Sequence, residues 1–314
     1  MLNIPKSLSG ITLAILFTGW QFLFTGCSDR AKLDQNGVPG KLVVAYYAGD
    51  NPSQTRNGLK PVREYLEKKL GMEVELLLTT DYATEIQALQ SKKVHLAELP
   101  PFAYIIATQK PGLVPLVTIG KDGKPAIYHS FIFTHPHSGV RTMDDLKAHA
   151  KELTLCFADP ASTSGHLIPR AHLISIGLDP KTAFRETLFA GTHAACIMSV
   201  LSGKVDIGCS TNDLAFRRMV AEGTVRQEDA VILWISPPII NDVITARKDL
   251  NKDFVRKLKE IYLRMASDDF AVFNSYISID YPDTRNMAYV PVEDSLYNGL
   301  RQVADGIRDI NLSR

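Results

Sequence analysis

Short apolar segments that predict strands alternate along this chain with longer segments of helical periodicity, and this alternation restricts the possible folds more than any other feature. Residues 41–47 predict a strand, 58–70 a helix with one apolar face, and 74–78 the next strand. The same order returns at 153–157, a strand, and at 167–176, a helix. Further strands are expected at 94–96, 113–119, 130–134, 205–209 and 231–235, and further helices at 82–90, 102–108, 143–150, 192–202, 213–222 and in most of the chain after 252. Because βαβ units favour parallel strands covered by helices, we expect an α/β fold with mostly parallel sheets.

The N-terminal residues indicate export from the cytoplasm. Lys6 precedes a largely apolar stretch at 11–24, which is short for a membrane span, and the residues Leu-Phe-Thr-Gly-Cys end at Cys27. This motif is similar to a bacterial lipobox, so we expect 1–26 to be a lipoprotein signal peptide and Cys27 to carry the lipid. The polar segment 27–40 predicts a flexible tether. An uncleaved anchor helix and a soluble secreted form are the alternatives, and all three place the remainder outside the cytoplasm, in the periplasm or on the cell surface.

Charge and cysteine content exclude several classes of function. The formal net charge of +1 argues against a nucleic-acid partner, which requires a basic face. Cys156, Cys196 and Cys209 are odd in number and lie in apolar surroundings, which favours buried free thiols over a disulfide framework. The pair formed by His193 and Cys196 lacks a second pair with metal-ligand spacing, so we expect neither a metal nor a cofactor.

One turn carries the clearest signal for a ligand. Ser162, Thr163, Ser164 and Gly165 lie between the strand at 153–157 and the helix that follows. Hydroxyl groups and free backbone N–H groups at the start of a helix converge on one point, where the helix dipole also favours negative charge. The turn therefore predicts an anion site, although Ser-Thr-Ser is also an ordinary helix N-cap.

An extracytoplasmic α/β chain of this size suggests a two-lobed solute-binding protein by analogy of fold. More specifically, the chain resembles the phosphonate-binding proteins of ABC importers, a branch of the type II periplasmic binding proteins. The matching segments lie in order at 81–83, 122–130, 159–169, 190–206 and 236–242. The resemblance implies two lobes, formed by 41–128 plus 238–314 and by 129–237. Two crossovers near residues 130 and 236 form the hinge, and the ligand closes the cleft.

The resemblance also implies which residues bind the ligand. At the positions that hold the phosphonate oxygens stand Tyr82, Tyr128, Ser162, Thr163, Ser164 and His193. Asp213 and Asp242 stand where two carboxylates accept the ammonium group of an aminoalkylphosphonate, although a glutamate is usual at the first position. Glu98 lies in a loop stiffened by Pro100 and Pro101, where a Gly-containing loop is common. A protonated His193 beside a dianion would make binding weaken as the pH rises.

These features predict a lipid-anchored binding protein that captures a phosphonate, phosphite or phosphate and delivers it to an ABC permease and ATPase. A periplasmic oxyanion sensor for a kinase, with an arsenic-binding variant at Cys156 or Cys196, has the same fold. A hydrolase with Ser164, His193 and Asp213 as its triad is the enzymatic alternative. Because the chain lacks the G-x-S-x-G elbow at this serine, we expect no enzyme.

Overall fold

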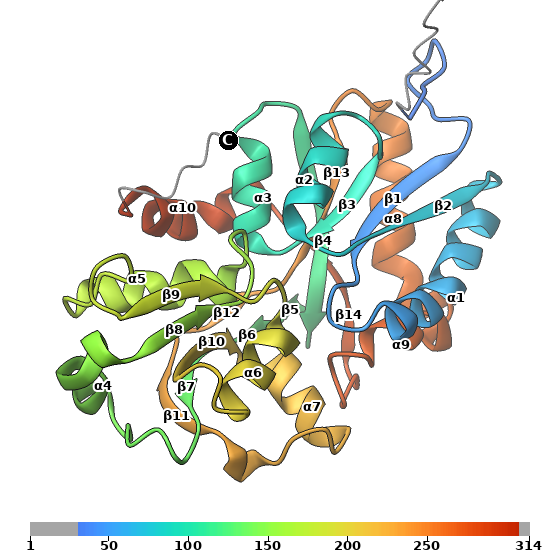
Figure 1. The fold of residues 1–314 in the computed structure, drawn as a ribbon. Helices are drawn as coiled ribbons and strands as arrows, with labels where there is room; N and C mark the ends of the chain where they lie inside the picture. The colour runs from blue at the N-terminus through green and yellow to red at the C-terminus, as the bar shows by residue number, and fades with distance from the viewer. Residues whose placement is uncertain (1–30, 308–314) are drawn as a thin grey trace, which may run out of the picture.

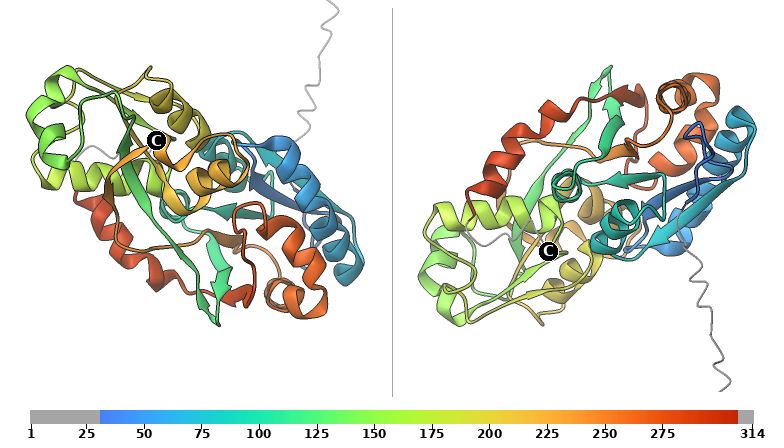
Figure 2. Two further views of the ribbon diagram at one scale, coloured as in Figure 1. Left: turned by 90° about the horizontal axis from the view of Figure 1, so that it is seen from below. Right: turned by 90° about the horizontal axis from the view of Figure 1, so that it is seen from above.

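The computed structural model describes residues 31–307, which form two lobes with a sheet in each (Figures 1 and 2). The expected signal peptide and the lipidation site Cys27 lie outside the described residues. Every apolar cluster that builds the cores described below lies within 31–307.

The first lobe is built on a sheet with the strand order β14-β4-β13-β3-β1-β2, to which the short β5 adds beside β4. Its strands are β1 (Leu42–Tyr47), β2 (Val74–Thr79), β3 (Leu96–Leu99), β4 (Leu113–Lys121), β5 (Lys124–Pro125), β13 (Val243–Arg247) and β14 (Met287–Pro291). Three helices cover one face, α1 (Pro52–Leu70), α8 (Lys252–Asp268) and α9 (Phe270–Ile277), and two cover the other, α2 (Tyr82–Gln90) and α3 (Pro101–Thr108). Each face therefore has its own apolar core.

The second lobe has a five-stranded sheet in the order β11-β7-β10-β8-β9. Its strands are β7 (Ser130–Thr134), β8 (Thr154–Phe157), β9 (Glu186–Phe189), β10 (Ile207–Thr211) and β11 (Val231–Ile235). Helices α4 (Met143–His149) and α5 (Ile168–Ser175) pack on one face, and α6 (His193–Leu201) and α7 (Arg217–Ala221) on the other. Cys156, Cys196 and Cys209 are buried free thiols in these cores, as predicted.

Two short strands connect the lobes. β6 (Ile127–Tyr128) pairs antiparallel with β12 (Ile239–Ile240), with Tyr128 opposite Ile239. The last helix, α10 (Asn298–Asp305), then packs against both α3 and α5 through a cluster of Phe102, Leu167, Ala304 and Ile307. The C-terminal segment, expected in the first lobe, therefore also contacts the second.

Strand direction follows from how the chain enters each sheet. β3, β1 and β2 are parallel neighbours in the first sheet, as are β10, β8 and β9 in the second. β13 and β7 enter their sheets from the connecting strands and run antiparallel to β3 and β10, respectively. The two-lobed α/β fold is confirmed, but its sheets are mixed, because each lobe includes a strand that leaves the hinge and runs away from it.

Some elements differ from the expectation. α1 begins at Pro52, six residues earlier, because the Asn51 side chain caps the backbone N–H of Gln54 at 3.1 Å and proline suits the first helical position. β9 was not expected, and β14 lies in the C-terminal region that was expected to be mainly helical.

Residues 31–40, part of the expected tether, are folded against the first lobe. Leu33 and Val38 pack on its core, and Leu33 forms a bridge with Pro39. The Asp34 carboxylate accepts backbone N–H bonds from Asn36 and Val38, both at 2.8 Å. Between residues 31 and 307, no helix has the length and apolar character needed to cross a bilayer.

Candidate ligand-binding site

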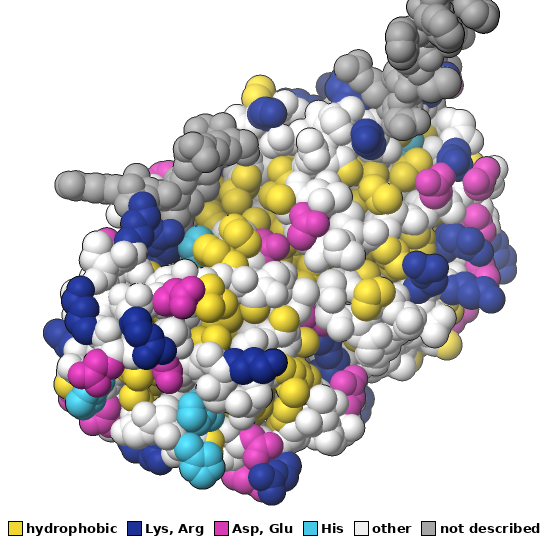
Figure 3. All heavy atoms as spheres, in the orientation of Figure 1, with side chains coloured by type: hydrophobic (Ala, Val, Ile, Leu, Met, Phe, Trp, Pro, Cys, Tyr) yellow, Lys and Arg dark blue, Asp and Glu magenta, His cyan; other side chains and the backbone are white. Residues whose placement is uncertain are grey.

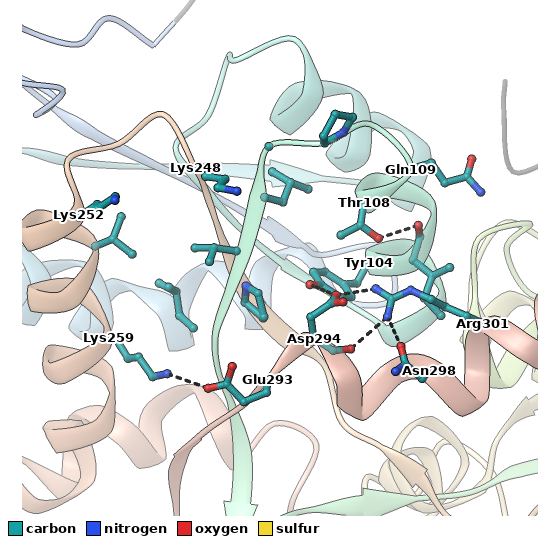
Figure 4. A pocket seen from close by; sticks show the side chains of 18 of the residues that line it. Tyr104, Thr108, Gln109, Lys248, Lys252, Lys259, Glu293, Asp294, Asn298 and Arg301 are labelled. Atoms are coloured by element: carbon teal, nitrogen blue, oxygen red, sulfur yellow. Dashed lines mark hydrogen bonds and ion pairs between the residues drawn. The ribbon is translucent and has the colours of Figure 1, made fainter.

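A small polar cavity of about 100 Å³ lies between the lobes. It is lined by the ends of β1 and β10, by the starts of α2 and α6, and by the hydroxyl turn. Its polar lining residues are Tyr47, Asp50, Asn51, Thr55, Tyr82, Glu98, Tyr128, Ser162, Ser164, His193, Thr211, Arg218, Asp242, Tyr276 and Asp280. A larger hollow of about 940 Å³ lies outside the cleft, between α8 and α10, and contains none of the expected site residues (Figure 4). The interlobe cavity is therefore the candidate site.

Residues 162–165, which we call the hydroxyl turn, follow β8. Ser162 is the N-cap of a π-helical turn at Thr163–Leu167. The Ser162 hydroxyl accepts the backbone N–H of Gly165 at 2.9 Å and lies 3.3 Å from Nε2 of His193. The backbone carbonyl of Ser164 accepts a hydrogen bond from the Ser130 hydroxyl at 2.6 Å. An added Cβ on Gly165 would lie 2.5 Å from Cβ of Ala158, so only glycine lets the turn fold back this closely.

His193 begins α6 directly after its N-cap, Thr192. Its imidazole lies between two hydroxyls, with Nδ1 3.0 Å from Oγ of Ser210 and Nε2 near Ser162. Burial lowers the pKa of His193. The side chain is therefore neutral at physiological pH in the unliganded protein and presents one ring N–H.

Tyrosines supply further donors from the first lobe and from the hinge. Tyr82 begins α2, and Tyr128 lies in β6. The ring of Tyr47, which no sequence motif marks, lies 4.3 Å from that of Tyr82, and its buried hydroxyl has no partner among the described residues. Burial raises the pKa of all three, so they remain neutral donors.

Two carboxyl groups face the cavity from the first sheet. Glu98 in β3 lies opposite Ile244 of β13, so Asp242, two residues before Ile244, projects on the same face as Glu98. The Tyr276 hydroxyl donates to Glu98 at 2.5 Å. Burial, together with Asp242, raises the pKa of Glu98 to about 8, and burial, together with Asp280, raises the pKa of Asp242 to about 7. Both groups carry protons in part at neutral pH.

Arg218, in α7, ties the lobes together. Its guanidinium donates to Asp280 at 2.6 Å and to Asp50 at 3.1 Å, both in the first lobe. Asp50 also accepts the backbone N–H of Ala194, at 3.0 Å. Burial opposes the charge on Arg218, but Asp280 and Asp50 more than offset it and raise its pKa. We call Arg218, Asp50 and Asp280 the cross-lobe cluster; it shows that this structure is the closed form.

Two expected binding residues do not line the cavity. The Thr163 hydroxyl accepts the backbone N–H of Phe102 at 2.9 Å and so joins the lobes. Asp213 is the second residue of the π-helical turn Asn212–Phe216 before α7, and its carboxylate lies at the rim, 2.6 Å from Nδ1 of His129 and 3.5 Å from Arg217. These partners satisfy Asp213 outside the cavity.

The contacts of His193 also bear on the hydrolase alternative. His193 contacts Ser162 and Ser210 rather than Ser164, and Asp213 contacts His129. The serine, histidine and aspartate proposed as a triad therefore do not form one. Residues 31–307 contain no group of three or more potential metal ligands.

The raised pKa of Glu98 predicts how stability depends on pH. A carboxyl that binds its proton more tightly in the folded chain contributes stability that is complete below about pH 4.5 and is lost as the pH rises to about 8. Glu98→Gln removes this loss, so we expect the stability of the variant relative to the wild type to rise between pH 4.5 and pH 8, by up to about 5 kcal/mol. Urea unfolding across this pH range measures the effect. An unchanged slope would show that Glu98 titrates normally.

Two lobes that meet around a small polar cavity, joined by two crossovers, define the class of periplasmic solute-binding proteins. Residues 44–297 match the model of a family described as the periplasmic phosphonate substrate-binding protein of ABC transporters. The chain belongs to this family. Because it is a family of substrate-binding proteins, the prediction that the chain is not an enzyme is confirmed.

Individual relatives agree with this assignment. The phosphate-import protein PhnD of Mycolicibacterium smegmatis is 28% identical, over 90% of this chain and 92% of that protein. The phosphonates-binding periplasmic protein of Escherichia coli K12 is 28% identical over 65% of this chain and 60% of that protein. Among solved structures, PhnD1 of Prochlorococcus marinus in complex with methylphosphonate has a TM-score of 0.74, with 19% identity over 85% of this chain and 98% of that one. At this level of sequence identity, the structural similarity shows a shared fold.

Proposed function

We propose that this chain is a lipoprotein, anchored through Cys27, that captures one small phosphorus oxyanion in the interlobe cavity and delivers it to an ABC importer. The observation that carries the proposal is the convergence of Ser162, Ser164 and His193 with Tyr82 and Tyr128 on the cavity. Their hydroxyl, ring and backbone donors come from both lobes, so a ligand that accepts from all of them favours the closed form. A cavity of about 100 Å³ is far below the several hundred Å³ that drug-sized ligands occupy, which supports phosphonate, phosphite or phosphate.

The cavity also limits the charge of its ligand. Arg218 forms ion pairs with Asp50 and Asp280, whereas Glu98 and Asp242 have no cationic partner among the described residues. An anion can bind beside these two carboxyls when they keep their protons, or when the ligand carries an ammonium group of its own. Weaker binding of simple oxyanions at high pH then arises from ionisation of Glu98 and Asp242, and not from deprotonation of His193.

Thermal unfolding of residues 31–314 with a panel of ligands tests the proposal. The panel contains methylphosphonate, phosphite, phosphate and 2-aminoethylphosphonate, with sulfate and taurine as controls. A ligand present at about a thousand times its Kd adds roughly 4 kcal/mol of stability, which raises Tm by several degrees. We expect a shift with at least one phosphorus oxyanion. The shift for a ligand without an amino group should be larger below pH 7 than above pH 8. No shift with any phosphorus oxyanion would contradict the proposed ligand class.

A further inference from the structure

The end of the first lobe that lies opposite the cleft is basic. β1, β3 and β4 begin at this end and β13 finishes there, so the loops at 31–40, 91–95, 109–112 and 248–252 meet. Hydrogen bonds join them: the backbone N–H of Ala31 donates to Lys92, that of Lys248 to Gly112, and that of Asn251 to Gly37, all within 2.7–2.8 Å. The exposed lysines of these loops, which we call the basic face, are Lys32, Lys92, Lys93, Lys110, Lys248 and Lys252.

The charge of this face differs from that of the chain as a whole. Its four loops contain six exposed lysines and two aspartates, Asp34 and Asp249, which leaves a net charge of +4 against +1 for the whole chain. Asp249 is already paired with Lys92 at 2.7 Å and with Arg247 at 2.9 Å. In Figure 3, Lys and Arg side chains line the upper edge of the molecule, at this end of the first lobe.

Lys248 and Lys252 are the two lysines of the basic face that also line a hollow. Neither side chain has an acidic partner within residues 31–307. Both line the hollow of about 940 Å³ (Figure 4), and Leu113, Val114 and Val255 contribute apolar surface to the same hollow. Phosphate groups with attached hydrocarbon match this combination of exposed ammonium groups and apolar wall.

The position of residue 31 brings this face close to a membrane. Ala31 lies on the basic face and is only four residues beyond Cys27. Four residues span at most about 14 Å, even when fully extended. A lipid on Cys27 therefore keeps the bilayer within about 14 Å of Ala31. The basic face can then approach anionic headgroups to within one Debye length, about 8 Å at physiological salt, where the attraction is not screened.

We propose that the basic face docks on the anionic phospholipid surface of the bacterial membrane. Headgroup phosphates contact Lys248 and Lys252, and the other lysines of the face add a less specific attraction. Because β1 runs from this face to the cavity, docking holds the cavity roughly 20 Å from the bilayer, the length of a six-residue strand. The orientation relies on the lipid anchor of the proposed function, but the attraction itself does not.

Sedimentation with vesicles tests the attraction without the anchor. The protein used is residues 31–314, which retains every core described above. We expect it to bind vesicles containing phosphatidylglycerol, to bind vesicles of phosphatidylcholine alone much less, and to dissociate at high salt. Since each lysine near an anionic membrane contributes about fivefold to affinity, K248E/K252E should weaken binding by at least 25-fold. The matched control is K147E/K204E, which makes the same charge change on exposed lysines of the second lobe and should have a small effect.

Three results would overturn the proposal. They are equal binding to both kinds of vesicle, equal losses in the two double variants, and complete release of the protein by soluble glycerol phosphate, which would mark a small phosphate site instead. Thermal shifts with the oxyanion panel separate this test from the proposed function. K248E/K252E lies outside the cleft, so it should keep the ligand response of the wild type whatever the vesicles show.

Discussion

Arg218→Met is expected to weaken ligand binding by about 100-fold or more. Arg218 and Asp50 are largely buried in the closed form, and the substitution leaves Asp50 and Asp280 facing each other without a cation. Removing one partner of a buried ion pair costs about 3–5 kcal/mol, and the partial exposure of Asp280 favours the lower end of this range. Because the pairs join the two lobes, most of this cost falls on the closed form, which is also the form that holds the ligand.

Titration calorimetry measures the loss of affinity, and small-angle X-ray scattering with and without ligand measures the loss of closure. The matched control is Arg217→Met, since Arg217 is an exposed neighbour that pairs, among residues 31–307, with the rim residue Asp213 at 3.5 Å and not with the first lobe. We expect the control to bind as the wild type does. Wild-type affinity in R218M would show that the cross-lobe cluster does not stabilise closure.

Ser162→Ala is expected to weaken oxyanion binding by about 10- to 100-fold while lowering stability only slightly. The Ser162 hydroxyl caps Gly165 and faces His193 inside the cavity. Losing the cap costs about 1 kcal/mol of stability, and losing a hydrogen bond to a charged ligand costs about 1.5–3 kcal/mol of binding energy. Calorimetry and thermal unfolding measure the two losses separately.

Ser202→Ala provides the comparison for Ser162→Ala, because the exposed Ser202 hydroxyl donates to the backbone carbonyl of Ser199 and does not line the cavity. This control should leave both binding and stability unchanged. A Ser162→Ala variant with the affinity of the wild type would remove Ser162 from the ligand site, even if its Tm fell.

The fold was predictable where local pattern decides it. The apolar faces at 58–70 and 82–90 identified α1 and α2, and the apolar runs identified β1 and β8, because helices and strands repeat their side chains with different periods. The sequence pattern did not predict β14, since this strand depends on its pairing with β4, a segment far away in the chain. The packing of Leu33 and Val38 on the first lobe depends in the same way on partners distant in sequence.

The candidate site shows the same division. Ser162, Ser164 and His193 lie at strand or helix ends that sequence signals mark, and the structure brings all three to the cavity. The sequence did not predict a role for Arg218, because its partners Asp50 and Asp280 come from the other lobe. The family resemblance implied that Asp213 contacts the ligand. In the structure, His129 and Arg217 contact its carboxylate at the rim of the cavity.

By itself, the sequence determined the α/β class, the hydroxyl turn and the expectation of export, because each depends on neighbours within a few residues. Only the tertiary structure decided that the sheets are mixed, that Arg218 joins the lobes beside Asp50 and Asp280, and that Glu98 and Asp242 share one face of the cavity. These features join residues separated by 62 positions or more. Their geometry, burial and pKa values exist only once the two lobes have folded and closed on each other.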